Sequence, residues 1–406
     1  MGKINTISML DKLKDRKNCI NLNGKNLIIT GGNGSGKTRF LERLHKQLKL
    51  MASSNEHRIS SEQYHMMIES AKSYLEDTQN PEPQKTERLI FSYMEKLNFL
   101  NDFEITLTNP SLFSHLMNHK NSYLCYFSAT RMSDITNDGK VSSKKVFDVE
   151  YDGLMNDSNF DSGCYLEKYL VAIWVHSLLD KAIYNLDELG WMAKKINLVI
   201  DDLRVLFEDD SLDLKFNPNE FRMEIHQDGK EPFGFDSLSS GYSSILSIYA
   251  NLFMRMNGPG VFKDEFSGIV IIDEIDVHLH VSLQKIIFPF LNKAFPNIQF
   301  IVSTHSPFVI QSVSDAVIYD MSSNEQMSDL SFYSYSSIVK GLLGEDDASD
   351  KLTALVNELL ELTNNNEFND RFDELVELIE KNKKNLDPRS RVSLALAQSK
   401  KMDAEG

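Results

Sequence analysis

The sequence is poor in cysteine and has no long apolar run. Its three cysteines are widely spaced among 406 residues and never form a CxxC pair, so they fit neither a disulfide framework nor a zinc site. No run of eighteen apolar residues exists, and residues 1–10 lack the apolar core and cleavage site of a signal peptide. These absences argue against a membrane-spanning or secreted protein. They predict a cytoplasmic protein with no membrane partner.

Basic residues are also scarce relative to acidic ones. Lysine and arginine number 43 against 59 aspartates and glutamates, which gives a net charge of −16. On average such a surface repels phosphate backbones, so any contact with nucleic acid must come from a local patch. The composition argues against a general DNA-coating protein and leaves DNA binding open.

A phosphate-binding motif stands near the start of the chain. The apolar strand pattern at residues 26–30 runs into GGNGSGKT at residues 31–38, which satisfies GxxxxGK[ST]. Glycines let backbone N–H groups surround phosphate oxygens, and a helix beginning near Lys37 presents its positive end to them. We expect Lys37 to reach the β- and γ-phosphates of ATP, and the Thr38 hydroxyl to bind Mg²⁺. The predicted nucleotide-binding set is Gly31, Gly32, Asn33, Gly34, Ser35, Gly36, Lys37, Thr38 and Arg39. An accidental glycine-rich turn is the alternative, expected in roughly one in a hundred chains of this length.

An apolar strand ending in two carboxylates follows much later, at residues 269–274 (IVIIDE). Asp273 can hold the Mg²⁺ water shell opposite the P-loop. Glu274 is placed to polarise a water for in-line attack on the γ-phosphate. An Asp-Glu pair after a strand is also common in a plain turn, and the P-loop upstream favours the catalytic interpretation.

Two further segments suit contacts with a γ-phosphate. Residues 238–242 (LSSGY) open a helix predicted to be amphipathic. A serine N-cap is the simple interpretation. The functional interpretation is that Ser239 and Gly241 bind the γ-phosphate of a nucleotide held by another subunit. His305 ends a second apolar strand, one helix after the Asp-Glu strand, where a γ-phosphate sensor is expected in a parallel sheet. A structural role is the alternative for this histidine.

Strand and helix patterns alternate along the chain around two fully apolar strands, which predicts an α/β sheet flanked by helices. Residues 132–163 are rich in Asp, Asn, Ser and Gly and predict a loop. The predicted organisation is a head with its P-loop at 1–40, a helical insertion at 41–101, head strands at 102–131, a loop plus helical insertion at 132–209, the rest of the head at 210–343, and an acidic helical segment at 344–406.

The order GGNGSGKT, LSSGY, IVIIDE, STHSP resembles the ATP-binding-cassette (ABC) class of ATPase, and more narrowly its RecF- and OLD-like branch, often labelled AAA. The resemblance implies an ABC-ATPase head with a mostly parallel core sheet, an antiparallel β subdomain and helical insertions. It also implies that two heads sandwich ATP. The residues acting in cis would be Lys37, Thr38, Asp273, Glu274 and His305, and those acting in trans Ser239, Ser240 and Gly241.

The sequence departs from the transporter pattern in several places. Tyr242 stands where transporters usually have glutamine, and His280 stands at their D-loop aspartate. The LHLH-like segment is similar instead to OLD-type and Septu-type antiviral ATPases. No Q-loop glutamine is evident, and Arg131 lies where we expect its replacement. His278 and His280 have no third metal ligand nearby, so we expect them to pack against a helix.

The acidic segment at 368–388 is similar to the tail of Septu-type, retron-associated and PARIS-system ATPases, although a plain amphipathic helix pair packing on the head is the alternative. The resemblance implies an ATP-hydrolysing sensor or scaffold subunit of a bacterial anti-phage system. Its expected partners are further copies of itself in an even-numbered homo-oligomer, a separate effector, expected to be a nuclease, and a phage-derived trigger.

We expect that this chain is not itself a nuclease, because no Toprim-like strand ending in Glu with a later Asp-x-Asp follows His305. A RecF- or SMC-like DNA-repair ATPase is the main alternative. A short insertion at 40–120, without a CxxC hook or sustained heptads, and the acidic charge argue against it. A transporter subunit is the third possibility, disfavoured by the insertions and the missing Q-loop.

Overall fold

The computed structural model describes residues 2–11, 16–53, 61–76, 81–110, 113, 122–130, 165–184, 190–257, 266–328, 330, 333, 335–338, 350–382, 386 and 388–405. The chain divides into two compact units, residues 1–333 and 334–406. Arg131 and the loop predicted at 132–163 lie outside the described residues.

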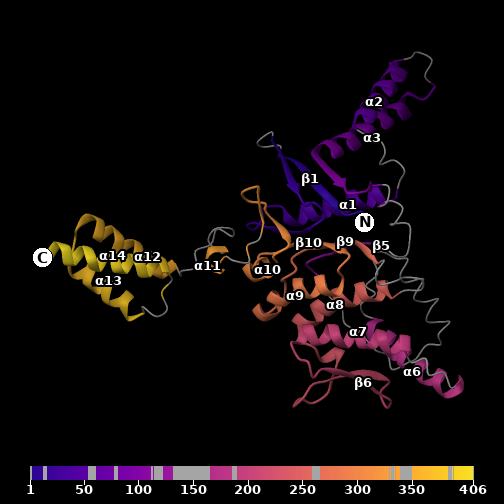
Figure 1. Cartoon of the computed structure of the whole chain (residues 1–406). Helices are drawn as coiled ribbons and strands as arrows, with labels where there is room; N and C mark the ends of the chain where they lie inside the picture. The colour runs from indigo at the N-terminus through magenta and orange to yellow at the C-terminus, as the bar shows by residue number, and fades with distance from the viewer. Residues whose placement is uncertain are drawn as a thin grey trace. The chain divides into compact units, whose positions relative to one another are not determined.

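A six-stranded sheet forms the centre of the first unit (Figure 1). Its order is β12 (Glu325–Ser328), β11 (Ala316–Asp320), β3 (Asn26–Thr30), β10 (Ile298–Ser303), β9 (Ser267–Ile272) and β5 (Ser122–Phe127). All neighbours pair in parallel except β11 with β12. The two strands β10 and β11 are buried along their whole length, as expected when helices cover both faces of a parallel sheet. The predicted α/β class with a mostly parallel core sheet is confirmed.

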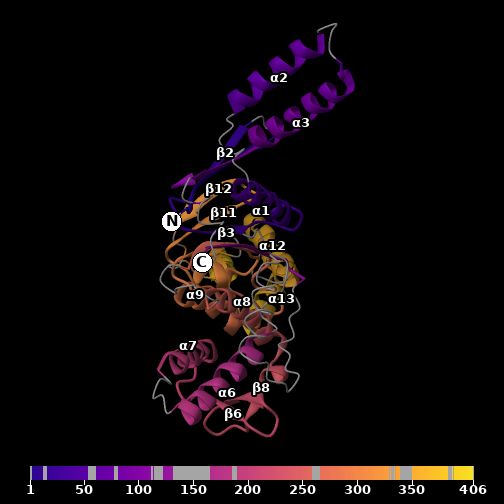
Figure 2. The same ribbon diagram turned by 90° about the vertical axis from the view of Figure 1, so that its right-hand side faces the viewer.

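Helices cover both faces of this sheet. In both views α1 (Lys37–Ser53) lies on one face, and α8 (Ser240–Met256) and α9 (Val281–Ala294) lie on the other (Figures 1 and 2). Beyond them α6 (Leu166–Tyr184) contacts α8, α7 (Gly190–Phe207) contacts α9, and the short α10 (Pro307–Gln311) also contacts α9.

The helix α8 is central rather than amphipathic. Its residues from Ser244 to Met254 are all buried. The hydroxyl of Tyr123 on β5 donates to Asn251 at 3.0 Å, and the hydroxyl of Tyr249 donates to Asp202 on α7 at 2.8 Å. The expected amphipathic pattern was wrong because α8 is enclosed between the sheet and the outer helices.

Two antiparallel sheets flank this core. The first has the order β2 (Arg16–Asn21), β1 (Ile4–Asp11), β4 (Phe103–Leu107), and the second consists of β6 (Asp213–Asn217), β7 (Arg222–His226) and β8 (Phe233–Gly234). The buried side chain of Gln299 on β10 joins the first sheet to the central one. It accepts from the Ile4 amide at 2.7 Å and donates to the Lys25 carbonyl at 2.7 Å.

A helical hairpin follows α1. Its helices α2 (Ser61–Glu76) and α3 (Pro83–Asp102) pack on each other through Tyr64, Ile68, Ile90 and Leu97. Across the described ranges, no helix combines the length and apolarity needed to cross a bilayer.

The second unit contains the short α11 (Tyr335–Ile338) and the helices α12 (Asp350–Asn365), α13 (Asp370–Lys381) and α14 (Pro388–Glu405). The side chain of Asn369 caps α13 by accepting from the Phe372 amide. The three long helices share one apolar core, made of Val356, Leu359, Phe372, Leu375, Ile379, Leu386, Leu394 and Ala397. Three helices therefore build the tail core, where the alternative considered above was a helix pair.

Candidate functional site

Three sequence motifs follow the carboxyl ends of adjacent parallel strands. The sheet order places β10 between β3 and β9. The P-loop follows β3, the Asp273-Glu274 pair follows β9, and His305 follows β10. Ligands of open α/β sheets bind at this edge. The fold therefore brings together segments that are some 270 residues apart (31 to 305).

The P-loop depends on glycine for its backbone shape. Gly31, Gly34 and Gly36 have φ values of +133°, +79° and +95°. A Cβ atom at Gly31 would lie 3.0 Å from the hydroxyls of both Ser35 and Ser322, whereas Gly34 and Gly36 face open space. The helix α1 begins at Lys37, as predicted. The loop therefore has the shape of a phosphate cradle.

Charged groups from several segments act on the ammonium group of Lys37. Its side chain is buried, and Nζ donates to the carbonyls of Gly31 at 2.9 Å and Gly32 at 3.1 Å. Burial lowers the pKa of Lys37, against the opposing effect of four carboxylates, which belong to Glu274, Asp273, Asp276 and Asp320. Carboxylates that follow β9 and one at the end of β11 thus act on the ammonium of Lys37.

Asp320 and Ser322 support the base of the P-loop, and sequence reasoning missed both. The hydroxyl of Ser322 accepts from the Gly32 amide at 2.9 Å. The buried carboxylate of Asp320 accepts from the amides of Ser322 at 2.9 Å and Ser323 at 3.2 Å. No local motif marks these residues, because they reach the P-loop only through the pairing of β11 with β3.

The Asp273 carboxylate is buried and held from several sides. Its Oδ1 accepts from the Ser303 hydroxyl at 2.5 Å, and its backbone amide donates to the Phe127 carbonyl at 2.8 Å. The Tyr126 hydroxyl on β5 lies 3.5 Å from Oδ2. Burial and the neighbouring Asp273 charge raise the pKa of Tyr126, which keeps this hydroxyl protonated.

The next residue, Glu274, has a left-handed backbone, with φ of +46°. Its amide donates to the Ser303 hydroxyl at 2.7 Å. Sequence reasoning identified the Asp-Glu pair but not the role of Ser303. The strand-end position of that serine, within STHSP, was the one available signal.

The expectation that His278 and His280 pack against a helix was wrong. Both side chains are exposed in the turn before α9, where His278 has φ of +63° and His280 is the N-cap residue. Nearby, the Thr304 hydroxyl donates to Asp276 at 2.5 Å. Within the described segments, no group of three or more His, Cys, Asp or Glu side chains is arranged to hold a metal.

His305 is half-buried between two anchored residues. The Thr304 amide donates to the Ile29 carbonyl of β3 at 3.0 Å. The Ser306 hydroxyl caps α10 and donates to Gln284 of α9 at 2.6 Å. The loop carrying His305 is therefore tied to both the P-loop strand and α9.

The start of α8 faces outward. Ser239 and Ser240 are exposed, and Ser239 occupies the N-cap position without a side-chain capping bond, so the simple capping interpretation does not hold for its hydroxyl. Gly241 is buried. A Cβ atom there would lie 2.9 Å from a methyl carbon of Leu283 and 3.3 Å from the His278 carbonyl. Glycine therefore lets α8 approach the segment before α9 closely without displacing these neighbours.

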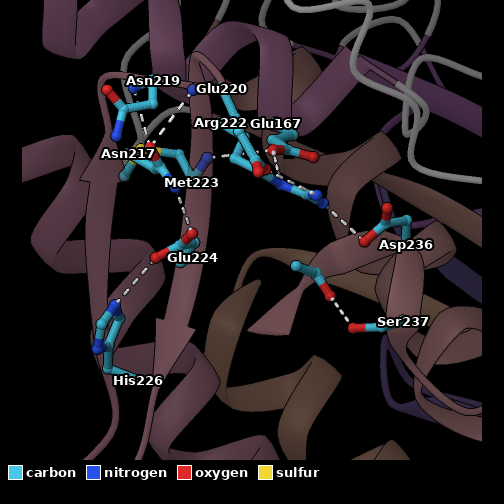
Figure 3. A network of polar contacts seen from close by, with 11 residues as sticks. Glu167, Asn217, Asn219, Glu220, Arg222, Met223, Glu224, His226, Asp236 and Ser237 are labelled. Carbon is cyan, nitrogen blue, oxygen red and sulfur yellow. Dashed lines mark hydrogen bonds and ion pairs between the residues drawn. The ribbon is translucent and has the colours of Figure 1, made fainter. Parts of the chain in front are cut away.

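A polar network anchors the turn η3 (Phe235–Ser237), which leads into this segment (Figure 3). Arg222 of β7 donates to Asp236 at 2.6 Å and lies 3.9 Å from the buried Glu167 of α6. Glu167 also accepts from the Met223 amide at 3.1 Å. The second antiparallel sheet and α6 are thus linked to the residues just before Ser239.

Comparison with known sequences identifies related proteins over parts of the chain. The family described as "AAA domain, putative AbiEii toxin, Type IV TA system" matches residues 177–311. The Retron Ec83 probable ATPase of Escherichia coli is 46% identical over 85 residues, 20% of this chain and 16% of that protein. The Retron Vc95 probable ATPase of Vibrio cholerae serotype O1 biovar El Tor is 30% identical over 138 residues, 33% and 26% of the two chains. The Septu protein PtuA of Bacillus mycoides (strain KBAB4) is 37% identical over 91 residues, 22% and 13% of the two chains.

These matches span about a quarter or less of each relative's own length. The predicted resemblance to retron-associated and Septu proteins is confirmed over these segments. Among solved structures, an Smc head bound to the C-winged helix domain of ScpA aligns with a TM-score of 0.37 at 12% identity, covering 80% of this chain and 98% of that one. An ATP-binding cassette of an ABC transporter in its ADP conformation gives 0.34 at 13%, covering 80% and 90%.

Proposed function

We propose that this chain binds and hydrolyses ATP as the sensor or scaffold subunit of a bacterial anti-phage defence system. One observation carries the ATPase assignment. The P-loop, the Asp273-Glu274 pair and His305 follow adjacent parallel strands, and both carboxylates act on the buried Lys37. The defence assignment is supported by the resemblance to retron and Septu proteins.

The residues present fit a nucleoside triphosphate with Mg²⁺. The buried hydroxyl of Ser35 makes no hydrogen bond to the described residues, and Gly34 and Gly36 leave room at the loop. We assign the phosphates to residues 31–39. Thr38, exposed on the first turn of α1, and Asp273 would hold Mg²⁺. The metal would neutralise charge on the phosphates.

In the proposed reaction, Glu274 accepts a proton from a water whose oxygen bonds to the γ-phosphorus. The bond from that phosphorus to the β–γ bridging oxygen breaks, and ADP and phosphate leave, with the proton passing to phosphate. Lys37 holds the β- and γ-phosphates, and His305 senses the γ-phosphate. We assign the role of the Q-loop glutamine to Arg131.

The exposed Ser239 and Ser240, together with Gly241 and the dipole of α8, which begins at Ser240, would bind the γ-phosphate held by a second copy. ATP would then bridge two heads, because each supplies half of the contacts, and hydrolysis would loosen the bridge. An even-numbered homo-oligomer in the cytoplasm would hold or release a separate effector chain, which we propose is a nuclease, in response to a phage-derived trigger.

Two variants of the full-length chain test the ATPase assignment. Lys37→Ala should abolish ATP binding, and Glu274→Gln should keep binding, lose hydrolysis by about 100-fold or more and accumulate an ATP-bound dimer measured by light scattering. Lys49→Ala, an exposed lysine on the same helix, is the matched control. Hydrolysis at the parent rate in both site variants would show that the site is assigned wrongly.

The partner assignment needs a separate experiment. The chain is purified with the product of its neighbouring gene, and the mass of the complex is measured with and without ATP. A stable complex with a nuclease-like chain is the expected result. Nuclease activity that stays with the pure chain through every purification step would contradict it.

A further inference from the structure

One serine joins both members of the proposed catalytic pair. Ser303, the last residue of β10, is completely buried. Its hydroxyl lies 2.5 Å from Oδ1 of Asp273 and 2.7 Å from the amide nitrogen of Glu274. A single side chain on one strand therefore contacts the end of the neighbouring strand at two consecutive residues.

The chemistry of the groups fixes the direction of both hydrogen bonds. An amide N–H can only donate, so the Ser303 oxygen accepts from Glu274. The only proton of the hydroxyl is then available to the Asp273 carboxylate. A separation of 2.5 Å is typical of an O–H donor to an ionised carboxylate. The serine hydroxyl therefore links the Glu274 backbone to the Asp273 side chain.

The backbone at this point needs such support. Glu274 has φ of +46°, a left-handed conformation that is unfavourable for a residue with a side chain. Ser303 holds the peptide groups on both sides of Glu274. Its hydroxyl accepts from the Glu274 amide, and its carbonyl accepts from the Ile275 amide at 3.0 Å.

The neighbouring strand-end residue makes a different contact. The Thr304 hydroxyl donates to Asp276 rather than to the catalytic pair. The Tyr126 hydroxyl reaches the other oxygen of Asp273, but only at 3.5 Å. Of these three hydroxyls, that of Ser303 lies nearest to the Asp273 carboxylate and also accepts from the Glu274 amide.

We propose that Ser303 is a positioning residue for ATP hydrolysis. Its hydroxyl holds the Asp273 carboxylate and the left-handed turn at Glu274 in one arrangement, so that the two carboxylates address the same phosphate group. The expected effect on ATP hydrolysis rests on the proposed function. The expected effect on the conformation of residues 273 and 274 can be measured without nucleotide.

Hydrogen exchange measures the geometric consequence on the full-length protein without nucleotide. In Ser303→Ala the Glu274 amide loses its acceptor, and its exchange should accelerate by about tenfold or more. Ser303→Thr keeps a hydroxyl and should keep most of the protection. Equal exchange in the alanine variant and the parent would overturn the proposal.

Turnover and nucleotide affinity measure the catalytic consequence. Ser303→Ala should lower kcat by about 10- to 100-fold and leave the Kd for ATP within about threefold, because the P-loop contacts remain. Ser303→Thr should restore most of the kcat, and Ser303→Cys, with similar volume but a weak donor, should behave like alanine. This split between kcat and Kd distinguishes positioning from general damage to the fold.

The matched control is Ser177→Ala, which removes a 2.6 Å hydrogen bond within α6, and it should keep the parent kcat. Parent-level turnover in Ser303→Cys would overturn the proposal. If Ser303→Ala does not fold, comparison of kcat between Ser303→Cys and Ser303→Thr tests the proposal instead. A parent chain that fails to hydrolyse ATP would contradict the proposed function, while the exchange experiment would still decide the geometric claim.

Discussion

The helices α1 and α8 both begin beside a short segment of glycine and serine, but the two helix starts are built in opposite ways. At α1 the side chain of Lys37 is buried and interacts electrostatically with four carboxylates at the ends of two other strands. At α8 the two serines, Ser239 and Ser240, are exposed, and only Gly241 is buried. One helix start is enclosed by charged groups of its own chain, and the other faces outward.

Glycine is favoured at the two starts for different physical reasons. At Gly31 the backbone has φ of +133°, which residues with a side chain rarely adopt. At Gly241 the backbone is ordinary helix, and glycine avoids close contacts with Leu283 and the His278 carbonyl. The same helix dipole is thus available at both starts. The proposed dimer would use one as the cis half and the other as the trans half of a shared site.

The largest expected effect comes from breaking the enclosed start. Gly31→Ala combines a strained backbone with three polar contacts at 3.0–3.1 Å, so ATP binding should weaken by about 100-fold or more. Gly34→Ala is the matched control, because its φ is also positive but a Cβ atom there meets open space. It should weaken binding by about tenfold or less. Binding of a fluorescent ATP analogue measures both, and equal losses would show that crowding at Gly31 is unimportant.

An intermediate effect is expected from blocking the outward-facing start. Gly241→Val would push the start of α8 away from Leu283, which should lower hydrolysis by about tenfold and weaken ATP-induced dimerisation. The P-loop is unchanged in this variant, so the Kd of the monomeric chain for ATP should stay within about twofold of the parent value. Light scattering and nucleotide titration separate the two effects. A loss of ATP binding equal to that of Gly31→Ala would contradict the proposal that the start of α8 belongs to the trans half of the ATP site.

The smallest expected effect concerns pH and involves α1 alone, because α8 contains no histidine. His45 of α1 stacks on Tyr126, and burial together with Lys49 lowers its pKa from 6.5 to about 4. The unfolded chain therefore binds this proton more readily. Stability from this residue is fully present above pH 6.5 and is lost as pH falls toward 4. The loss is roughly 2 kcal/mol, because the partial solvent exposure of His45 reduces the about 3.4 kcal/mol that the full pKa difference would give.

Denaturant unfolding across this pH range measures the contribution of His45. His45→Gln should flatten the pH dependence of the free energy of unfolding. His65→Gln, at an exposed position on α2, should keep the parent dependence because His45 remains. An unchanged slope in His45→Gln would show that this histidine does not couple protonation to folding.

Local patterns were sufficient to predict the elements that carry the motifs. The apolar runs at β3, β9 and β10 lie where they were expected, and α1 begins at the predicted Lys37. These elements could be predicted because strand and helix signals and the glycine-rich loop are contiguous in sequence.

Contacts between distant segments could not be predicted. Ser322 reaches Gly32 only because β11 pairs with β3, and Ser303 reaches Asp273 only because β10 pairs with β9. The same limit explains why α8 was predicted to be amphipathic. The sequence does not show that α6 and α9 contact this helix and bury it. The histidines were expected to pack against a helix, but they lie in the turn before α9, where His280 is the N-cap residue.

The strand order also determines when during synthesis the phosphate loop can be completed. The hairpin of α2 and α3 contacts neighbours along the chain and can form soon after it leaves the ribosome. Strand β3 is made long before its partners β10 and β11, because Thr30 pairs with Asp320. At ordinary rates of translation this interval is on the order of 15–60 s. Throughout it the nascent chain carries a glycine-rich loop with no sheet to hold it, and nucleotide can assist folding only after β10 and β11 have been made.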